Sequence, residues 1–223
     1  MSMFDALRKK SYINAMTSVS YIGEPIYDLE LRRSSDLRTC SKSMLREWMN
    51  SRWGIKDQFS LNKKLEWLFY KGHRMEFTQL SYLLSTLSHD KRNQFIYNLP
   101  EHDPRKIKLY HVNQFMGTLT SAGIAAFDYS LYMLLSQIGV RLNYRKRDEA
   151  KAFYLEVAQI AQSKYQSWIE FIQSYIAGMY FHSLPQESDI VRDRSYTLAQ
   201  LITQKNSAIN SVEWNIKLRN AEG

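Results

Sequence analysis

Three side chains in this sequence, His73, Arg74 and Asp128, are of types that carry acid–base or anion-binding chemistry. His73 and Arg74 lie in the string KGHRMEF, directly after a glycine that is expected to end a helix, where a side chain can turn back into the fold. Asp128 lies in the apolar string GIAAFDYSLYMLLSQIG, on the helical face that also carries Ile124 and Leu131. An unpaired charge inside an apolar core is strongly unfavourable, so the sequence predicts a partner for this carboxylate.

Two interpretations of Asp128 follow. In the structural one, Asp128 is more than half buried and forms an ion pair with Arg74, whose planar fork can bond both carboxylate oxygens. Trp168 and Tyr175 are further candidates for this buried polar network. In the catalytic one, Asp128, His73 and Arg74 surround a pocket in which Asp128 is a general base or an anchor for a polar ligand. Buried polar groups are more often satisfied structurally, which favours the ion pair.

Other catalytic and metal-binding patterns are missing from the sequence. None of the five histidines is paired at the spacing of a zinc helix motif, and a single cysteine, Cys40, cannot complete a thiolate site. His73 and Glu76 have the three-residue spacing seen in di-iron bundles, but matching inward acids on other helices are lacking. There is no glycine-rich phosphate loop and no GxSxG string. We therefore expect no metal site and no cofactor, and an enzyme is the less favoured class.

The elements that would position these residues are helices, because apolar residues recur at helical spacing along most of the chain. The helices are expected at about residues 36–54, 60–72, 77–87, 103–116, 120–139, 147–166, 167–181 and 189–202. The string SVEWNIKL near the end predicts a short strand or a fixed extended segment. Together these patterns predict an all-α, compact multi-helix single domain.

The composition of the chain indicates its cellular location and the kind of partner it could bind. No apolar run approaches the ~20 residues of a membrane span, and the start of the chain lacks the apolar core of a signal peptide, so we expect a cytoplasmic protein that does not bind membranes. The single cysteine fits a reducing compartment. The net charge of +8 is concentrated in residues 1–112, which hold 19 Lys+Arg against 12 Asp+Glu. Arg105, Lys106 and Lys108 are the basic candidates for binding a partner.

Five strings occur in a fixed order along the chain: WGI at 53–55, GHRMEF at 72–77, AAFD at 125–128, DEA at 148–150 and SWIEFIQSYIAGMYF at 167–181. As an ordered set, they resemble the bacterial domain-of-unknown-function 1266 family. The resemblance implies a bacterial, cytoplasmic, helical protein and implies no activity. Within the one domain, it divides the chain into an N-terminal helical region (1–52), a family-like helical core (53–182) and a C-terminal helix and tail (183–223).

The chain also departs from the pattern of that family. The family often has a tryptophan before the aspartate and an arginine three residues after it, where this chain has Phe127 and Leu131. An arginine also often follows the late glycine, where this chain has Met179. With these basic residues missing, Asp128 depends more on Arg74 or Arg141.

Three classes of function remain open, in order of preference. The first is a non-enzymatic helical module that binds another protein, of which an immunity protein that neutralises a cognate bacterial toxin is one form. Because inhibitors tend to complement the charge of their target, an acidic toxin would suit this basic chain best. The second is an enzyme with the pocket around Asp128, His73 and Arg74. The third is nucleic-acid binding through the basic N-terminal half, which needs a continuous basic stripe and aromatic platforms.

Overall fold

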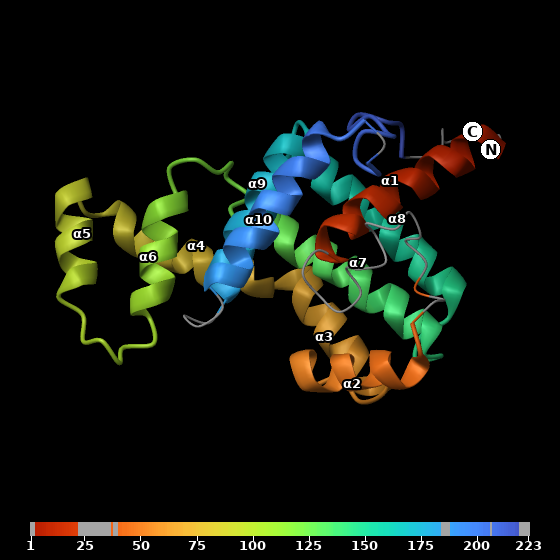
Figure 1. The fold of residues 1–223 in the computed structure, drawn as a ribbon, viewed down its shortest axis with the longest axis horizontal. Helices are drawn as coiled ribbons and strands as arrows, with labels where there is room; N and C mark the ends of the chain where they lie inside the picture. Colours follow the sequence, from red (N-terminus) through yellow and green to blue (C-terminus); the bar gives the residue numbers. More distant parts are fainter. Residues whose placement is uncertain (1–2, 22–36, 38–39, 184–187, 206, 219–223) are drawn as a thin grey trace.

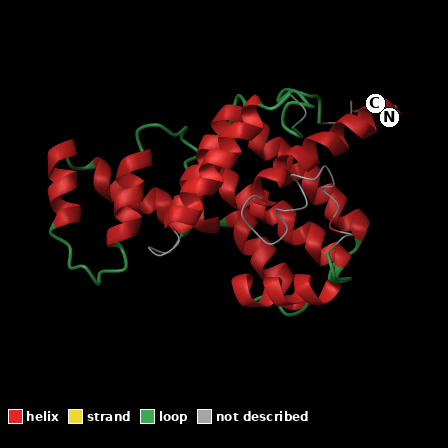
Figure 2. Cartoon of the chain, viewed as in Figure 1, coloured by secondary structure: helices red, strands yellow, loops and turns green. Residues whose placement is uncertain are grey.

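The structure is a computed structural model that describes residues 3–21, 37, 40–183, 188–205 and 207–218. Every regular element in this part of the chain is a helix (Figure 2). The helices are α1 (Met3–Tyr21), α2 (Lys42–Trp53), α3 (Gln58–Tyr70), α4 (Gly72–Ser85), α5 (His89–Tyr97), α6 (Lys106–Phe115), α7 (Ala125–Arg141), α8 (Arg147–Lys164), α9 (Trp168–His182) and α10 (Ser188–Thr203). The prediction of an all-α single domain is confirmed.

Helix α7 runs through the middle of the fold (Figure 1). It packs against α1, α3, α4, α8 and α9, and α2 also touches it. Nearly all of its residues are buried, so its apolar surface extends around the helix instead of forming the single stripe that the sequence suggested. Asp128 lies in its first turn and is therefore enclosed by protein on every side.

One end of the molecule is a small lobe made of α4, α5 and α6, which stands away from the rest of the bundle (Figure 1). We call residues 72–115 the lobe. Its interior belongs to a second apolar cluster, in which Phe77, Leu84, Ile96 and Leu109 pack with residues outside the lobe, including Phe181 of α9. Helix α4 connects the two parts of the fold, because it begins beside α3 and α7 and also packs against α6. Helix α9 also packs against both α4 and α6, so the start of α4 and the surface of α9 together hold the lobe.

The ends of the first helices differ from the prediction in detail. Gly54 ends α2 with a left-handed φ of 67°, as expected of a C-terminal glycine. The expected start of that helix at residue 36 lies outside the described residues, and α2 begins after Ser41. Asp57, and not Ser60, is the N-cap of α3, since its carboxylate accepts a hydrogen bond from the Ser60 N–H at 2.8 Å.

The later helix boundaries also agree with the prediction at some positions and differ from it at others. The break between α8 and α9 falls at residues 165–167, and Ser167 caps α9 as predicted. Helix α6 begins at Lys106, two residues after the proline that was expected to open it. Helices α1 and α5 were not predicted, because neither has a clear apolar stripe.

The C-terminal tail, residues 207–218, is irregular, with turns at 208–211 and 214–215, and packs on the bundle without pairing as a strand. Side chains alternate between buried and exposed along residues 211–218, with Val212, Trp214, Ile216 and Leu218 buried. The side-chain amide of Gln162 donates to the carbonyl of Trp214 at 2.6 Å and to that of Ile216 at 3.1 Å. These bonds tie the tail to α8, so the segment is held in place, but its turns differ from both the strand and the extended segment that were expected.

Candidate functional site

Asp128 is fully buried, and its carboxylate accepts three hydrogen bonds from the start of α4. The backbone N–H of His73 donates to Oδ1 at 2.8 Å, and the backbone N–H of Arg74 donates to Oδ2 at 3.0 Å. The guanidinium of Arg74 also donates to Oδ2 at 3.0 Å, which makes the ion pair. Both residues that the sequence placed beside Asp128 therefore contact it, although His73 does so only through its backbone.

This carboxylate acts as an N-cap supplied from another helix. The first N–H groups of a helix have no partner within the helix, and a side-chain oxygen normally satisfies one of them. Lys71, at the N-cap position of α4, makes no such bond, and Asp128 of α7 takes that role. Gly72 makes the approach possible, because it has a left-handed φ of 63° and a Cβ at this position would overlap the Asp128 carboxylate.

Arg74 connects the same carboxylate to the end of α3. Its Nη1 donates to the carbonyl of Leu68 at 2.7 Å, and its Nη2 donates to the carbonyl of Phe69. These carbonyls belong to the last turn of α3, where backbone acceptors lack partners and a cation is favourable. The guanidinium also lies 5.3 Å from the ring centre of Tyr129. One ion pair therefore holds α3, α4 and α7 together.

The environment of Asp128 limits what it can do chemically. Burial raises its pKa to about 6, while the hydrogen bonds and the positive charge from Arg74 act in the opposite direction. A raised pKa is common among catalytic acids. A general base, however, must reach its substrate, and this carboxylate has no exposed surface and already accepts three protein donors. The geometry is that of a structural ion pair.

The imidazole of His73 points away from Asp128 into a group of rings. It lies 4.4 Å from the ring of His182, 4.8 Å from that of Trp67 and 5.5 Å from that of Phe127, measured between ring centres. Its Nε2 is buried and has no hydrogen-bond partner in the described structure. Burial, reinforced by nearby cationic side chains, lowers the pKa of His73 to about 2. The ring is therefore neutral near pH 7 and is a poor proton carrier there.

The other members of the expected network lie elsewhere. The indole of Trp168 donates to the carbonyl of Val212 at 2.9 Å, and its ring packs on Tyr12 and Trp214, so it serves the C-terminal tail. Tyr175 packs its ring 5.5 Å from that of Phe127. Arg141, the alternative partner, is in the last turn of α7, roughly 20 Å along the helix from Asp128 at 1.5 Å per residue.

A second buried polar network near Asp128 was not predicted. The hydroxyl groups of Tyr165 and Ser174 lie 2.8 Å apart, and both are within hydrogen-bond distance of the backbone N–H of Ala126, which donates to them. Ser174 also donates to the carbonyl of Gly123 at 2.7 Å. These bonds satisfy the start of α7 and fix the helix that carries Asp128. The one signal in the sequence is a serine within the apolar string of α9.

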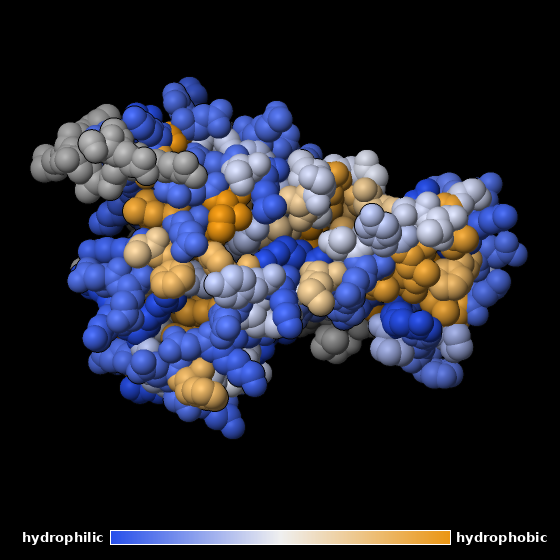
Figure 3. Space-filling view, turned by 180° about the vertical axis from the view of Figure 1, so that it is seen from behind, coloured by the Kyte–Doolittle hydropathy of each residue, from blue (hydrophilic) through white to orange (hydrophobic). Residues whose placement is uncertain are grey.

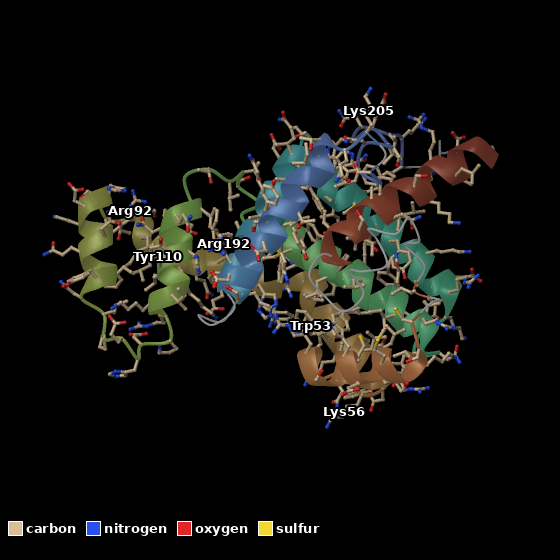
Figure 4. The ribbon with its side chains drawn as sticks, viewed as in Figure 1. Trp53, Lys56, Arg92, Tyr110, Arg192 and Lys205 are labelled. Atoms are coloured by element: carbon tan, nitrogen blue, oxygen red, sulfur yellow. The ribbon has the colours of Figure 1, made fainter. Side chains whose placement is uncertain are left out.

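A small cavity lies on the other side of Phe127, between α1, α2, α7, α9 and α10. Its volume is about 30 Å³. Trp53 at the end of α2 forms part of its wall and lies near one end of α10 (Figure 4). The lining residues are Ser20, Trp48, Arg52, Trp53, Phe127, Leu131, Leu134, Tyr175, Met179, His182, Ser183, Val191 and Arg194.

The sequence of the chain matches one known protein family. The sequence model of the family described as Protein of unknown function (DUF1266) matches residues 48–214. The chain belongs to this family. The DUF1266 region contains the corner between α3 and α4, the Asp128 network and all of the cavity except Ser20 of α1. No curated protein and no solved structure matches the chain.

The three basic residues expected to bind a partner are engaged within the DUF1266 lobe itself. Arg105 pairs with Asp103 at 2.7 Å, and Lys108 pairs with Glu76 at 2.7 Å. Lys106 pairs with Glu101 at 2.5 Å and donates to the carbonyl of Leu99 at 3.0 Å, near the end of α5. Neighbouring carboxylates therefore offset their positive charge. This arrangement weakens the case for a basic surface that attracts nucleic acid or an acidic protein.

The described residues of this DUF1266 protein form neither a cluster of metal-binding side chains nor a membrane-spanning helix. They contain no group of three His, Cys, Asp or Glu side chains placed to hold a metal ion. In the same part of the chain, no helix is both long enough and apolar enough to cross a membrane.

Proposed function

We propose that this chain is a non-catalytic protein-binding module and that its lobe carries the interface. The observation that supports the proposal is an apolar stripe on the outer face of α4. Met75, Tyr82 and Leu83 are 46%, 75% and 44% exposed, and Gln79 between them is also exposed. Their spacing puts all four on one face of the helix, opposite the face that packs into the lobe through Phe77 and Leu84. We call these four residues the α4 stripe.

The composition of this surface is typical of protein interfaces. Tyrosine and methionine are enriched at interfaces relative to the rest of a protein surface. Two more exposed tyrosines, Tyr97 on α5 and Tyr110 on α6, belong to the same lobe (Figure 4 labels Tyr110). Apolar side chains gather on the back of the lobe in the space-filling view (Figure 3). Exposed apolar side chains that adjoin one another on a surface often mark a protein-binding site.

The charges of the lobe favour one kind of partner, a protein with an apolar and nearly uncharged contact surface. Residues 72–115 hold six Lys+Arg and four Asp+Glu, and three of the basic residues are in ion pairs within the lobe. A strongly acidic partner would gain little here. Within this proposal, the specific form we favour is a bacterial, cytoplasmic immunity protein whose lobe covers a cognate toxin.

The experiment uses the protein encoded beside this gene as the candidate toxin and measures its affinity for the purified chain by calorimetry. The double variant Tyr82→Ala/Leu83→Ala should weaken binding by at least about tenfold, because each exposed anchor contributes on the order of 1 kcal/mol or more. The matched control is Tyr196→Ala/Leu7→Ala, which removes a similarly exposed tyrosine and leucine from α10 and α1. We expect the control to change the affinity by less than about twofold.

The outcomes separate the parts of the proposal. Absence of binding to the neighbouring gene product would reject the immunity form. Binding that both double variants leave unchanged would reject the lobe as the interface. Because the lobe charges are compensated, the association rate should fall little as salt rises; a steep fall would instead favour an acidic partner.

A further inference from the structure

Arg145, in the loop between α7 and α8, forms no ion pair with any carboxylate among the described residues. Its Nη1 donates to the hydroxyl of Tyr132 at 3.2 Å and to that of Ser136 at 3.0 Å. Both acceptors are neutral, so they hold the guanidinium without offsetting its charge. Its Nε and Nη2 make no hydrogen bond in the described part of the chain. These two nitrogens form the side of the guanidinium that can bond both oxygens of one anion.

The loop that carries Arg145 is fixed in place. The backbone N–H of Tyr144 donates to the carbonyl of Gly139 at 2.8 Å. The Tyr144 hydroxyl donates to the carbonyl of Lys56, also at 2.8 Å (Figure 4 labels Lys56). The guanidinium carbon of Arg145 lies 4.8 Å from the ring centre of Phe153, which is a stacking distance. Because the guanidinium is already positioned, a ligand that binds it loses little affinity to the ordering of this side chain.

Exposed aromatic rings continue the surface that begins at Arg145. Phe153 of α8 is 40% exposed, and Tyr70 at the end of α3 is 73% exposed. The ring of Phe69 lies between them, with its centre 6.4 Å from that of Phe153 and 4.9 Å from that of Tyr70. A planar apolar group can pack against such rings. We call Tyr70, Arg145 and Phe153 the Arg145 platform.

The charges around the platform limit the kind of anion that it can bind. Burial raises the pKa of the Tyr132 hydroxyl, the hydrogen bond and the charge of Arg145 lower it, and the charges of Glu156 and Tyr70 raise it. Arg145, Glu156 and Tyr70 therefore all lie near this one hydroxyl. The negative charge of Glu156 disfavours a polyanion such as nucleic acid, while the single guanidinium suits one carboxylate.

We propose that the Arg145 platform binds a carboxylate beside an aromatic ring, with the carboxylate on Nε and Nη2 of Arg145 and the ring against Tyr70 and Phe153. A free aromatic acid and an acidic, aromatic segment of a protein both offer this chemistry. The inference is independent of the lobe interface, because the platform uses no residue of the α4 stripe. It gives the chain a second recognition surface that selects its ligand by charge.

The test is a titration of the purified full chain with sodium benzoate, followed through backbone amide signals in a nitrogen–proton correlation spectrum. Sodium chloride at equal ionic strength is the reference. The signals of Tyr70, Arg145 and Phe153 should shift saturably, and those of the α4 stripe should not move. Benzamide, which keeps the ring and lacks the charge, should bind at least about tenfold more weakly than benzoate.

A second probe distinguishes the two sources of the ligand. It is the dipeptide of phenylalanine and glutamate with both ends blocked, so that its one carboxylate is a side chain. Tighter binding of the dipeptide than of benzoate would identify a protein segment as the ligand. Tighter binding of benzoate would identify a free aromatic acid.

Variants test the two parts of the platform separately. Arg145→Lys keeps the charge and loses the planar fork, and it should weaken benzoate binding by about tenfold or more. The matched control is Arg147→Lys, which changes an exposed arginine two residues away and should leave the affinity unchanged. Tyr70→Leu should weaken binding by about threefold through the loss of a ring contact. Its control is Phe59→Leu, which replaces a 78% exposed ring near the other end of α3.

Three results would overturn the proposal. The first is the absence of any saturable shift with benzoate beyond the effect of chloride. The second is benzamide binding as tightly as benzoate, which would reject the carboxylate contact. The third is an equal loss of affinity in Arg145→Lys and Arg147→Lys, which would show an effect of general surface charge. If Arg145→Lys did not fold, Tyr70→Leu would decide, and an unchanged benzoate affinity in that variant would reject the platform.

Discussion

Replacing Asp128 with alanine should destabilise the protein by about 3–4 kcal/mol, because breaking a buried ion pair leaves a charge without its counter-ion. The change removes the acceptor of three hydrogen bonds: two backbone N–H groups at the start of α4 and the Arg74 guanidinium. The usual range for such a loss is about 3–5 kcal/mol. The lower part applies here, since Arg74 is 18% exposed and keeps the carbonyls of Leu68 and Phe69 as acceptors.

The assay is urea unfolding followed by circular dichroism, with thermal unfolding as a second measurement. For a chain of this length, about 3–4 kcal/mol corresponds to a fall in Tm of roughly 6–16 °C. Asp148→Ala is the matched control, because it removes an acid from the first turn of α8 whose side chain is 94% exposed. The control should change stability by less than about 0.5 kcal/mol. If Asp128→Ala also changed stability by less than about 1 kcal/mol, the ion pair would not be what holds α3, α4 and α7 together.

Three further predictions concern the same contacts. Gly72→Ala should lower stability by about 2 kcal/mol or more, because Gly72 has a left-handed φ and an added Cβ would overlap Asp128. Gly117→Ala is the control, since a Cβ there would meet open space, and it should be nearly neutral in the same urea assay. Because folding raises the pKa of Asp128 from 3.8 to about 6, its titration adds stability below about pH 4 that is lost as pH rises through 6. The difference in unfolding free energy between wild type and Asp128→Asn should therefore fall by roughly 2 kcal/mol from pH 4 to 7, and a flat difference would contradict the raised pKa. Lys106→Ala should cost about 1 kcal/mol and speed hydrogen exchange at the end of α5, whose carbonyls it bonds; unchanged exchange would show that it does not hold that loop.

The sequence was most informative at the residues that depart from the surrounding pattern of apolar residues at helical spacing. An acid among apolar residues at helical spacing requires a partner, and the glycine before His73 and Arg74 marked a corner from which a side chain can turn inward. That reasoning selected Arg74 and Asp128, and the structure brings them to 3.0 Å. It also separated α8 from α9, because a serine followed by a glutamate three residues later is a local signal that needs no tertiary information.

What the sequence did not reveal depends on contacts between distant segments. It did not show that the backbone of His73, and not its imidazole, would meet Asp128, since the direction of a side chain is set by packing. It did not reveal the lobe, because α5 is short and has little apolar periodicity of its own. It placed Arg105, Lys106 and Lys108 on a binding surface, and only the fold shows that each lies beside a carboxylate.

The Asp128 network and the proposed interface are joined by a single helix. Helix α4 begins at Gly72 under the Asp128 carboxylate, and the α4 stripe starts three residues later at Met75. A cap that is fixed by α7 sets the position and direction of the first turn of α4, and the rest of that rigid helix carries the stripe and the lobe with it. The strings GHRMEF and AAFD, about fifty residues apart in the chain, encode the two halves of this one contact. A buried carboxylate without access to solvent can therefore influence binding at a surface that it never touches, because it fixes the start of the helix that carries the stripe, while α9 supports the lobe from its other side.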